Sequence, residues 1–195
     1  FGNAVWTVTN ASISANQTTA PDGLTTGAKI IEAATTSTHL MFQNTAITSG
    51  TTYTQTVYAK AAERTVLQIT PSTGFTGSGS SYQNYNLANG TLGSFLGSGV
   101  ASITDVGNGW YRCQYTAAAN ATTSGRMAFY LVTSSTSVRA ESYAGDGTSG
   151  IYLWGAQLEA GAFATSYIPT TSAALTRNAD VATMTGTNFS DWFNA

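Results

Sequence analysis

Residues 145–170, GDGTSGIYLWGAQLEAGAFATSYIPT, predict a turn, a strand and then an irregular exit that reaches a proline. Three glycines and Asp146 at the start supply the left-handed and side-chain-capped positions that a chain reversal needs. Residues 151–158 are apolar at nearly every position, which is typical of a strand covered on both faces. The stretch therefore predicts a buried strand late in the chain.

Similar short runs of alternating or apolar residues recur along the whole chain, separated by clusters of Gly, Ser, Asn and Asp. The runs cover residues 5–8, 28–33, 39–43, 53–61, 66–70, 82–87, 100–105, 110–117, 126–132 and 150–159. Helical periodicity and internal repeats are not apparent. Many short strands joined by glycine-rich turns predict an all-β fold, an antiparallel β-sandwich of the jelly-roll kind.

The composition excludes several classes of partner. Only 8% of the residues are charged and the formal net charge is −2, so the chain lacks the clustered cations that nucleic-acid binding requires. No apolar run is long enough for a membrane span, which needs about 18 residues. Cys113 is the only cysteine, which rules out an intrachain disulfide and suits a protein that folds in bacterial cytoplasm. We expect Cys113 to be a small buried residue and not a reactive thiol.

Three segments carry a resemblance to a known family. They are residues 145–170, residues 101–115 (ASITDVGNGWYRCQY), and residues 53–60 (YTQTVYAK) with Tyr85-Asn86-Leu87 and Asn89-Gly90-Thr91 further on. Over residues 6–171 the chain resembles β-sandwich modules of bacteriophage tail and other virion-associated proteins, which are similar to galactose-binding-like carbohydrate-binding domains. The resemblance implies a lectin-like module of a tail fibre or another part of the virion, or an extracellular one, folded in the host cytoplasm.

The end of the chain differs in pattern from the rest. We expect residues 1–175 to form the sandwich, and residues 176–195 to be a linker or tail leading to a following domain of the same polypeptide. Phe189, Trp192 and Phe193 cluster in that tail without strand alternation.

Catalytic groups are sparse. The nine Asp and Glu residues include no closely spaced pair of the kind that flanks a glycosidic bond, and Asp105 and Asp146 lie in glycine-rich turns that they can cap. His39 is the sole histidine; it either lies on the surface at a strand edge or hydrogen-bonds a sugar. We therefore expect no enzymatic activity.

A structural Ca²⁺ is a cofactor that the resemblance implies, held near the end of the last strand. The corresponding place, Trp154-Gly155-Ala156, carries no carboxylate. Asp22 and Glu159, with backbone carbonyls, are the remaining candidates for such an oxygen site.

Strand parity predicts which side chains face outward. In residues 110–116, Tyr111, Cys113 and Tyr115 share one face, and the hydrophobic character of Cys113 turns that face inward. The same reasoning places Met127, Phe129 and Leu131 inside. The predicted ligand-binding set on the outer face is Tyr58, Lys60, Gln68, Arg112, Gln114, Arg126 and Tyr130.

This outer set suits a sugar, because pyranose faces stack on aromatic rings and hydroxyl groups bond to amides and guanidinium groups. The alternative is a merely polar sheet face, with the site in loops near Trp110, Tyr82, Tyr85 or His39. The leading hypothesis is a non-catalytic module that binds a surface polysaccharide. A structural spacer or decoration domain, and less favoured a jelly-roll glycoside hydrolase or lyase, remain open.

Overall fold

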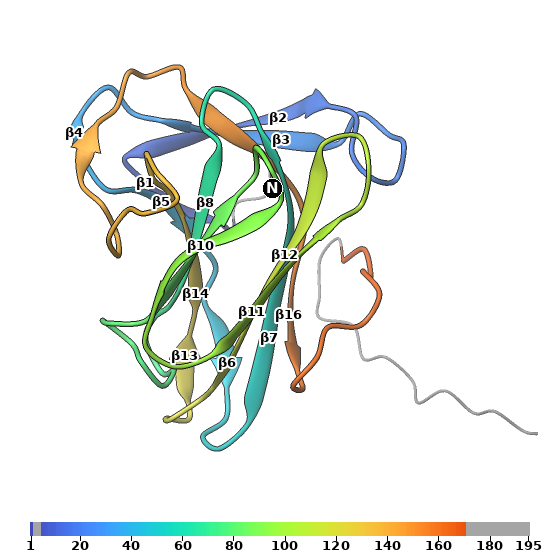
Figure 1. Cartoon of the computed structure of the whole chain (residues 1–195). Coiled ribbons are helices and arrows are strands. Elements are labelled where there is room, and N and C mark those ends of the chain that lie inside the picture. Colours follow the sequence, from blue (N-terminus) through green and yellow to red (C-terminus); the bar gives the residue numbers. More distant parts are fainter. Residues whose placement is uncertain (2–4, 171–195) are drawn as a thin grey trace, which may run out of the picture.

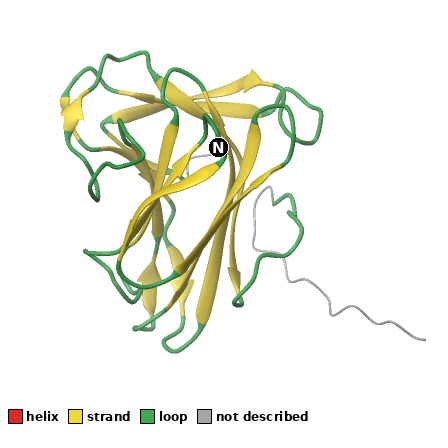
Figure 2. Cartoon of the chain, in the orientation of Figure 1, coloured by secondary structure: helices red, strands yellow, loops and turns green. Residues whose placement is uncertain are grey.

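Two antiparallel β-sheets packed face to face make up the structure, a computed structural model that describes residues 1 and 5–170 (Figures 1 and 2). These described residues form strands, turns and loops and include no helix. The predicted all-β antiparallel sandwich is therefore confirmed. The expected tail, residues 176–195, and the last five residues of the expected sandwich lie outside the described residues.

Sheet A and sheet B each contain six strands. The order in sheet A is β1 (Thr7–Thr9), β5 (His39–Phe42), β14 (Met127–Leu131), β8 (Val66–Pro71), β9 (Tyr82–Asn86) and β10 (Thr91–Leu96). The order in sheet B is β11 (Val100–Asp105), β12 (Trp110–Ala118), β7 (Thr52–Ala61), β16 (Gly150–Ala160), β3 (Gly27–Glu32) and β2 (Ala11–Thr18). Two small pairs join β13 (Thr123–Gly125) to β6 (Thr45–Ile47) and β15 (Tyr143–Ala144) to β4 (Thr36–Ser37).

The core lies between the inner faces of the two sheets. Cys113 on β12 pairs with Val57 on β7, and both side chains are fully buried. Burial raises the pKa of the Cys113 thiol, which keeps it protonated and unreactive, as expected for a small core residue. The other residues predicted to face inward are also buried, except that Tyr111 is only half-buried, because it lies near the sheet edge beside β11.

A bulge interrupts β16 halfway along its pairing with β7. The register shifts between Trp154 and Gln157, and Gly155 adopts a φ of +59° there. Such an insertion changes which residues face each side of the sheet. Before the bulge Tyr152 and Trp154 face outward, and after it Gln157 and Glu159 do.

One end of the sandwich is closed by a buried ion pair. The carboxylate of Glu32 accepts hydrogen bonds from Arg64 Nε (2.8 Å) and Nη2 (2.6 Å), from Tyr143 Oη (2.7 Å) and from the Asp146 N–H (2.9 Å). These contacts join β3, the β7–β8 turn and the loop that precedes β16. Burial alone would raise the pKa of Glu32, but the donors around it outweigh burial, and its pKa lies below the usual value.

Glu32→Gln is expected to lower the free energy of unfolding by about 3 kcal/mol at neutral pH. This is the low end for a broken buried pair, because the Arg64 side chain is 25% exposed. The lowered pKa of Glu32 stabilises the fold above the pKa of an unfolded glutamate, about 4.3, and this contribution disappears as the pH falls further. The difference between wild type and variant should therefore be constant above about pH 5 and shrink below about pH 4.

Chemical denaturation across this pH range measures the effect. Glu63→Gln is the matched control, because Glu63 pairs with Lys29 at 2.7 Å but its side chain is 53% exposed. We expect that control to change stability by less than about 1 kcal/mol. Equal losses in the two variants would contradict the role given to Glu32.

Candidate functional site

The seven residues predicted to share one outer face lie on two different sheets. Tyr58 and Lys60 on β7 and Arg112 and Gln114 on β12 belong to sheet B, whereas the other three belong to sheet A or its border: Gln68, Arg126 and Tyr130. The outer faces of the two sheets point in opposite directions. The prediction of a single seven-residue face is therefore wrong, because strand parity separates inside from outside but does not assign a strand to a sheet.

Gln68 is fully buried although it faces away from the core. The loop after β14 returns over it. Gln68 Nε2 donates to Asn84 Oδ1 at 2.7 Å and to the Val138 carbonyl at 3.0 Å, and Gln68 Oε1 accepts from the Ala140 N–H at 2.7 Å. Gln68 thus anchors this loop and is not an exposed binding group.

Arg126 and Tyr130 form no common site with the groups on sheet B. Arg126 precedes β14 and is not in the middle of a strand; its guanidinium carbon lies 4.0 Å from the centre of the Phe42 ring. Its Nη1 also donates to Asn44 Oδ1 at 3.5 Å. Tyr130 is half-buried on β14, opposite Leu40 of β5.

The outer face of sheet B carries an aromatic cluster, which we define as Tyr58, Trp154 and Tyr167. Arg112, Tyr58 and Trp154 are directly paired across β12, β7 and β16. Measured between ring centres, Trp154 lies 5.2 Å from Tyr58 and 4.6 Å from Tyr167, and the centres of the two tyrosine rings are 6.4 Å apart. All three side chains are half-buried, so part of each stays accessible.

Trp154 and Tyr167 were missed as site residues by the sequence analysis. Residues 151–158 predicted a strand covered on both faces, and indeed Ile151 and Leu153 are buried in the core. Tyr152 and Trp154 alternate with them and are half-buried on the other side. The signal for an outward Trp154 was this alternation, whereas Tyr167 lies in an irregular segment for which parity predicts nothing.

The segment after β16 folds back over the outer face of sheet B. Gln157 Oε1 accepts from the Ile168 N–H at 2.9 Å, and its Nε2 donates to the Ser166 carbonyl at 3.5 Å. The carboxylate of Glu159 accepts from the N–H of Thr165 at 3.1 Å and from its hydroxyl. We call residues 161–170 the return segment; it brings Tyr167 to Trp154.

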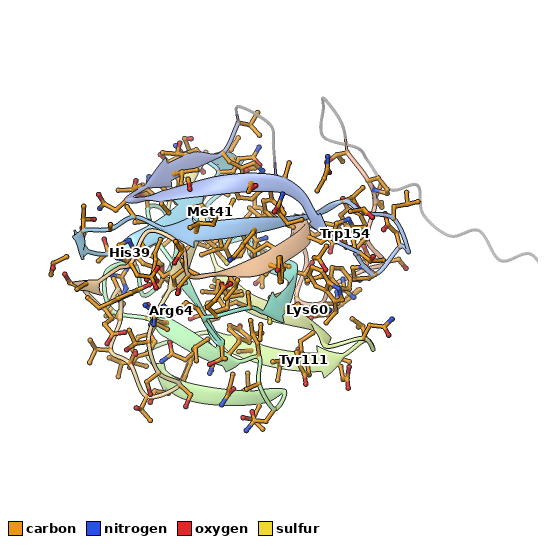
Figure 3. The ribbon with its side chains drawn as sticks, turned by 90° about the horizontal axis from the view of Figure 1, so that it is seen from above. His39, Met41, Lys60, Arg64, Tyr111 and Trp154 are labelled. Atoms are coloured by element: carbon orange, nitrogen blue, oxygen red, sulfur yellow. The ribbon has the colours of Figure 1, made fainter. Side chains whose placement is uncertain are left out.

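Two cations border the aromatic cluster. The guanidinium carbon of Arg112 lies 5.8 Å from the centre of the Tyr58 ring, and Arg112 Nη2 donates to the carbonyl of Thr165 in the return segment. Arg112 Nε is buried and has no partner among the described residues. Lys60 lies two residues further along β7, where it pairs with Trp110 of β12 and Tyr152 of β16. Lys60 and Trp154 are labelled in Figure 3. No carboxylate of the described residues forms an ion pair with Lys60.

The position of Tyr167 in the return segment affects the ionisation of its hydroxyl group. Burial raises the pKa of Tyr167, and the nearby carboxylate of Asp22 raises it further. Tyr167 is therefore protonated at neutral pH and presents a hydroxyl that can both donate and accept.

The alternative loop candidates are all buried. Tyr85 and Tyr82 are in β9, and Trp110 is covered on the outer face of sheet B, where its Nε1 donates to the Thr19 carbonyl at 3.0 Å. His39 is fully buried, with Nδ1 2.5 Å from the Asn10 carbonyl and Nε2 3.3 Å from the Tyr143 carbonyl. The expectation of a surface His39 is wrong, because the turn at Asn10 and Tyr143 of β15 enclose its ring.

The two carboxylates considered for Ca²⁺ accept hydrogen bonds from the protein. Asp22 Oδ1 accepts from the Leu24 N–H at 3.0 Å and closes a turn, and Glu159 holds Thr165 in the return segment. Among the described residues no group of three or more His, Cys, Asp or Glu side chains is placed to hold a metal ion. Asp22 and Glu159 therefore act as caps in this structure.

No helix in the described part of the chain has the length and hydrophobicity to cross a membrane. A comparison with protein-family models finds no match, and neither does a comparison with curated protein sequences.

Gln157→Ala is expected to loosen the end of the return segment. The Ile168 N–H would lose its acceptor, and loss of a hydrogen bond worth about 1 kcal/mol would raise its amide exchange rate about fivefold. The Thr165 N–H, which is bound by Glu159, serves as the internal control and should change much less. Hydrogen exchange followed by NMR distinguishes the two positions; an unchanged rate at Ile168 would contradict the contact.

Proposed function

We propose that this domain is a non-catalytic glycan-binding module whose site is the aromatic cluster with Arg112 and Lys60 on the outer face of sheet B. The observation that carries the proposal is the presence of three half-buried aromatic rings outside the core, bordered by two cations. Core packing accounts for none of these five side chains.

The chemistry of the cluster suits a sugar. The C–H face of a pyranose can cover an aromatic ring, and the adjacent guanidinium and ammonium groups donate hydrogen bonds to hydroxyl or carboxylate groups of the ring. Gln114 continues the face along β12 with a half-buried amide. The low charge of the chain and the resemblance of residues 145–170 support a place in a bacteriophage tail or another virion-associated protein, acting outside the cell.

The carboxylates support a binding role over a catalytic one. Glu32 is saturated by four donors, and Asp146 caps the turn before β16 through the Thr148 and Ser149 N–H groups at 2.7 Å each. Glu141 holds the loop over sheet A by accepting from Thr133 and Ser137. Each has a structural task, Glu32 and Asp146 at the start of β16 and Glu141 in the loop over sheet A.

Trp154→Ala is expected to weaken glycan binding by about 1–3 kcal/mol, roughly 5- to 150-fold, on the scale of stacking between a base and an aromatic ring. A glycan array identifies a ligand, and calorimetry then measures its affinity for both proteins. Tyr130→Ala is the matched control, because Tyr130 is a half-buried aromatic residue on the outer face of sheet A. Loss of affinity in the control but not in Trp154→Ala would move the site to sheet A.

Incubation with the ligand polysaccharide is expected to release no new reducing ends. Product that accumulates with wild type and disappears in a variant of a single carboxylate, such as Glu159→Gln, would replace the binding proposal with an enzymatic one.

A structural spacer is the second candidate, and the return segment specifically favours it. Arg112 already bonds to Thr165, and Tyr58 and Trp154 already contact Tyr167, so the cluster also fastens the return segment to sheet B. If no glycan binds and Trp154→Ala lowers only the stability, the cluster is a clamp for the chain and the spacer role holds.

A further inference from the structure

A shallow groove opens on the outer face of sheet B, next to the point where the return segment leaves β16. Its volume is about 370 Å³, within the size range of small-ligand sites. The strand ends supply Thr52, Val100 and Ala118, the turn between β10 and β11 supplies Ser98, and Thr76 and Ala162 complete the wall. Nothing in the proposed glycan site uses these residues.

The groove and the aromatic cluster lie on the same face. Val100 on β11 pairs with Thr116 on β12, four residues along the strand from Arg112, which pairs with Tyr58. At about 3.3 Å per residue, the two places are about 13 Å apart. Gln114 lies between them and keeps the intervening surface polar.

The lining of the groove is uncharged and contains no aromatic ring. Its apolar part consists of small aliphatic groups, of which Val100 is 68% exposed. The hydroxyls of Thr52, Thr76 and Ser98 have no hydrogen-bond partner among the described residues, so they are available to a ligand. Such a lining fits a small group that combines a methyl with a hydrogen-bonding atom, and it offers nothing to a carboxylate or to the flat face of a sugar ring.

The turn that forms one wall is held in place. The hydroxyl of Tyr115 donates to the Ser98 carbonyl at 2.5 Å, and burial raises the pKa of Tyr115 to about 12, so the donor keeps its proton. Gly99 has a φ of +122°, and a Cβ there would lie 2.7 Å from the Tyr115 hydroxyl. A side chain at position 99 would therefore displace the wall, and glycine keeps the groove open.

We propose that the groove is a second subsite, which binds the methyl group of an uncharged sugar unit: the acetamido group of an N-acetylated sugar or the C6 methyl of a 6-deoxy sugar. The inference rests on the proposed function, because it makes the ligand a glycan that extends from the aromatic cluster to the groove. It names the substrate class: a neutral unit bearing a methyl group, joined to a unit that stacks on Trp154.

NMR of protein labelled at the alanine methyl groups tests the subsite directly. The probes are the free sugars N-acetylglucosamine, rhamnose and glucose, of which only glucose lacks a methyl group, each at up to about 10 mM, tenfold above a weak Kd of about 1 mM. We expect either or both of the first two to shift Ala118 and Ala162 in a saturable manner, and glucose to leave them unshifted. Ala15, exposed on β2, is the control position. Equal shifts with glucose, or none with any probe, would overturn the proposal.

Val100→Trp fills the groove and should abolish these shifts, because position 100 is exposed and lies in the wall. Val106→Trp is the matched control; Val106 is 41% exposed in the β11–β12 turn and outside the groove. For an oligosaccharide found on the array, Val100→Trp should reduce affinity at least fivefold and Val106→Trp should not.

The two proposals fail separately. Binding that depends on Trp154 but is unaffected by Val100→Trp leaves the glycan module and removes the subsite. If Ala118 shows saturable shifts but Trp154→Ala leaves the affinity for the oligosaccharide unchanged, a sugar site in the groove remains and the aromatic site is removed.

Discussion

Strand β16 holds sheet B together, because it is hydrogen-bonded to β7 on one side and to β3 on the other. Both neighbours come from the first third of the chain, whereas β16 begins at Gly150, 89 residues after the end of β7. The buried pair of Glu32 and Arg64 fixes the start of β16, where Arg64 N–H also donates to the Gly150 carbonyl at 3.0 Å. The position of β16 then determines the outer surface, because its pairing with β7 sets Trp154 beside Tyr58 and its bulge turns Gln157 and Glu159 toward the return segment.

Local sequence signals predicted the strands, the fold class and the inward residues of β12 and β14, because alternation reports burial within one strand. Pairing between distant strands could not be predicted in this way. Tyr58 and Tyr130 both have outward parity, yet they lie on opposite faces of the molecule, because β7 belongs to sheet B and β14 to sheet A. Assigning a strand to a sheet depends on contacts far apart in the sequence.

Strand parity also fails to predict which outward side chains of the candidate site are covered by loops. Parity correctly predicted that Gln68 and Trp110 point away from the core, yet both side chains are buried. The loop after β14 covers Gln68, and the turn between β2 and β3 covers Trp110. Surfaces made by loops that return over a sheet have no periodicity to detect. Tyr167 belongs to this kind of surface, so the aromatic cluster became visible only when the return segment was placed in space.

The two kinds of attachment around β16 differ under mechanical load. A pull on the chain beyond Thr170 would act first on the return segment, whose contacts through Ile168, Tyr167 and Thr165 follow one another along the chain and would separate one at a time. The force would then reach β16, whose pairing with β7 extends from Ile151 to Ala160 and loads several hydrogen bonds at once. The return segment would thus extend and absorb displacement at low force, while the sandwich behind it keeps its shape.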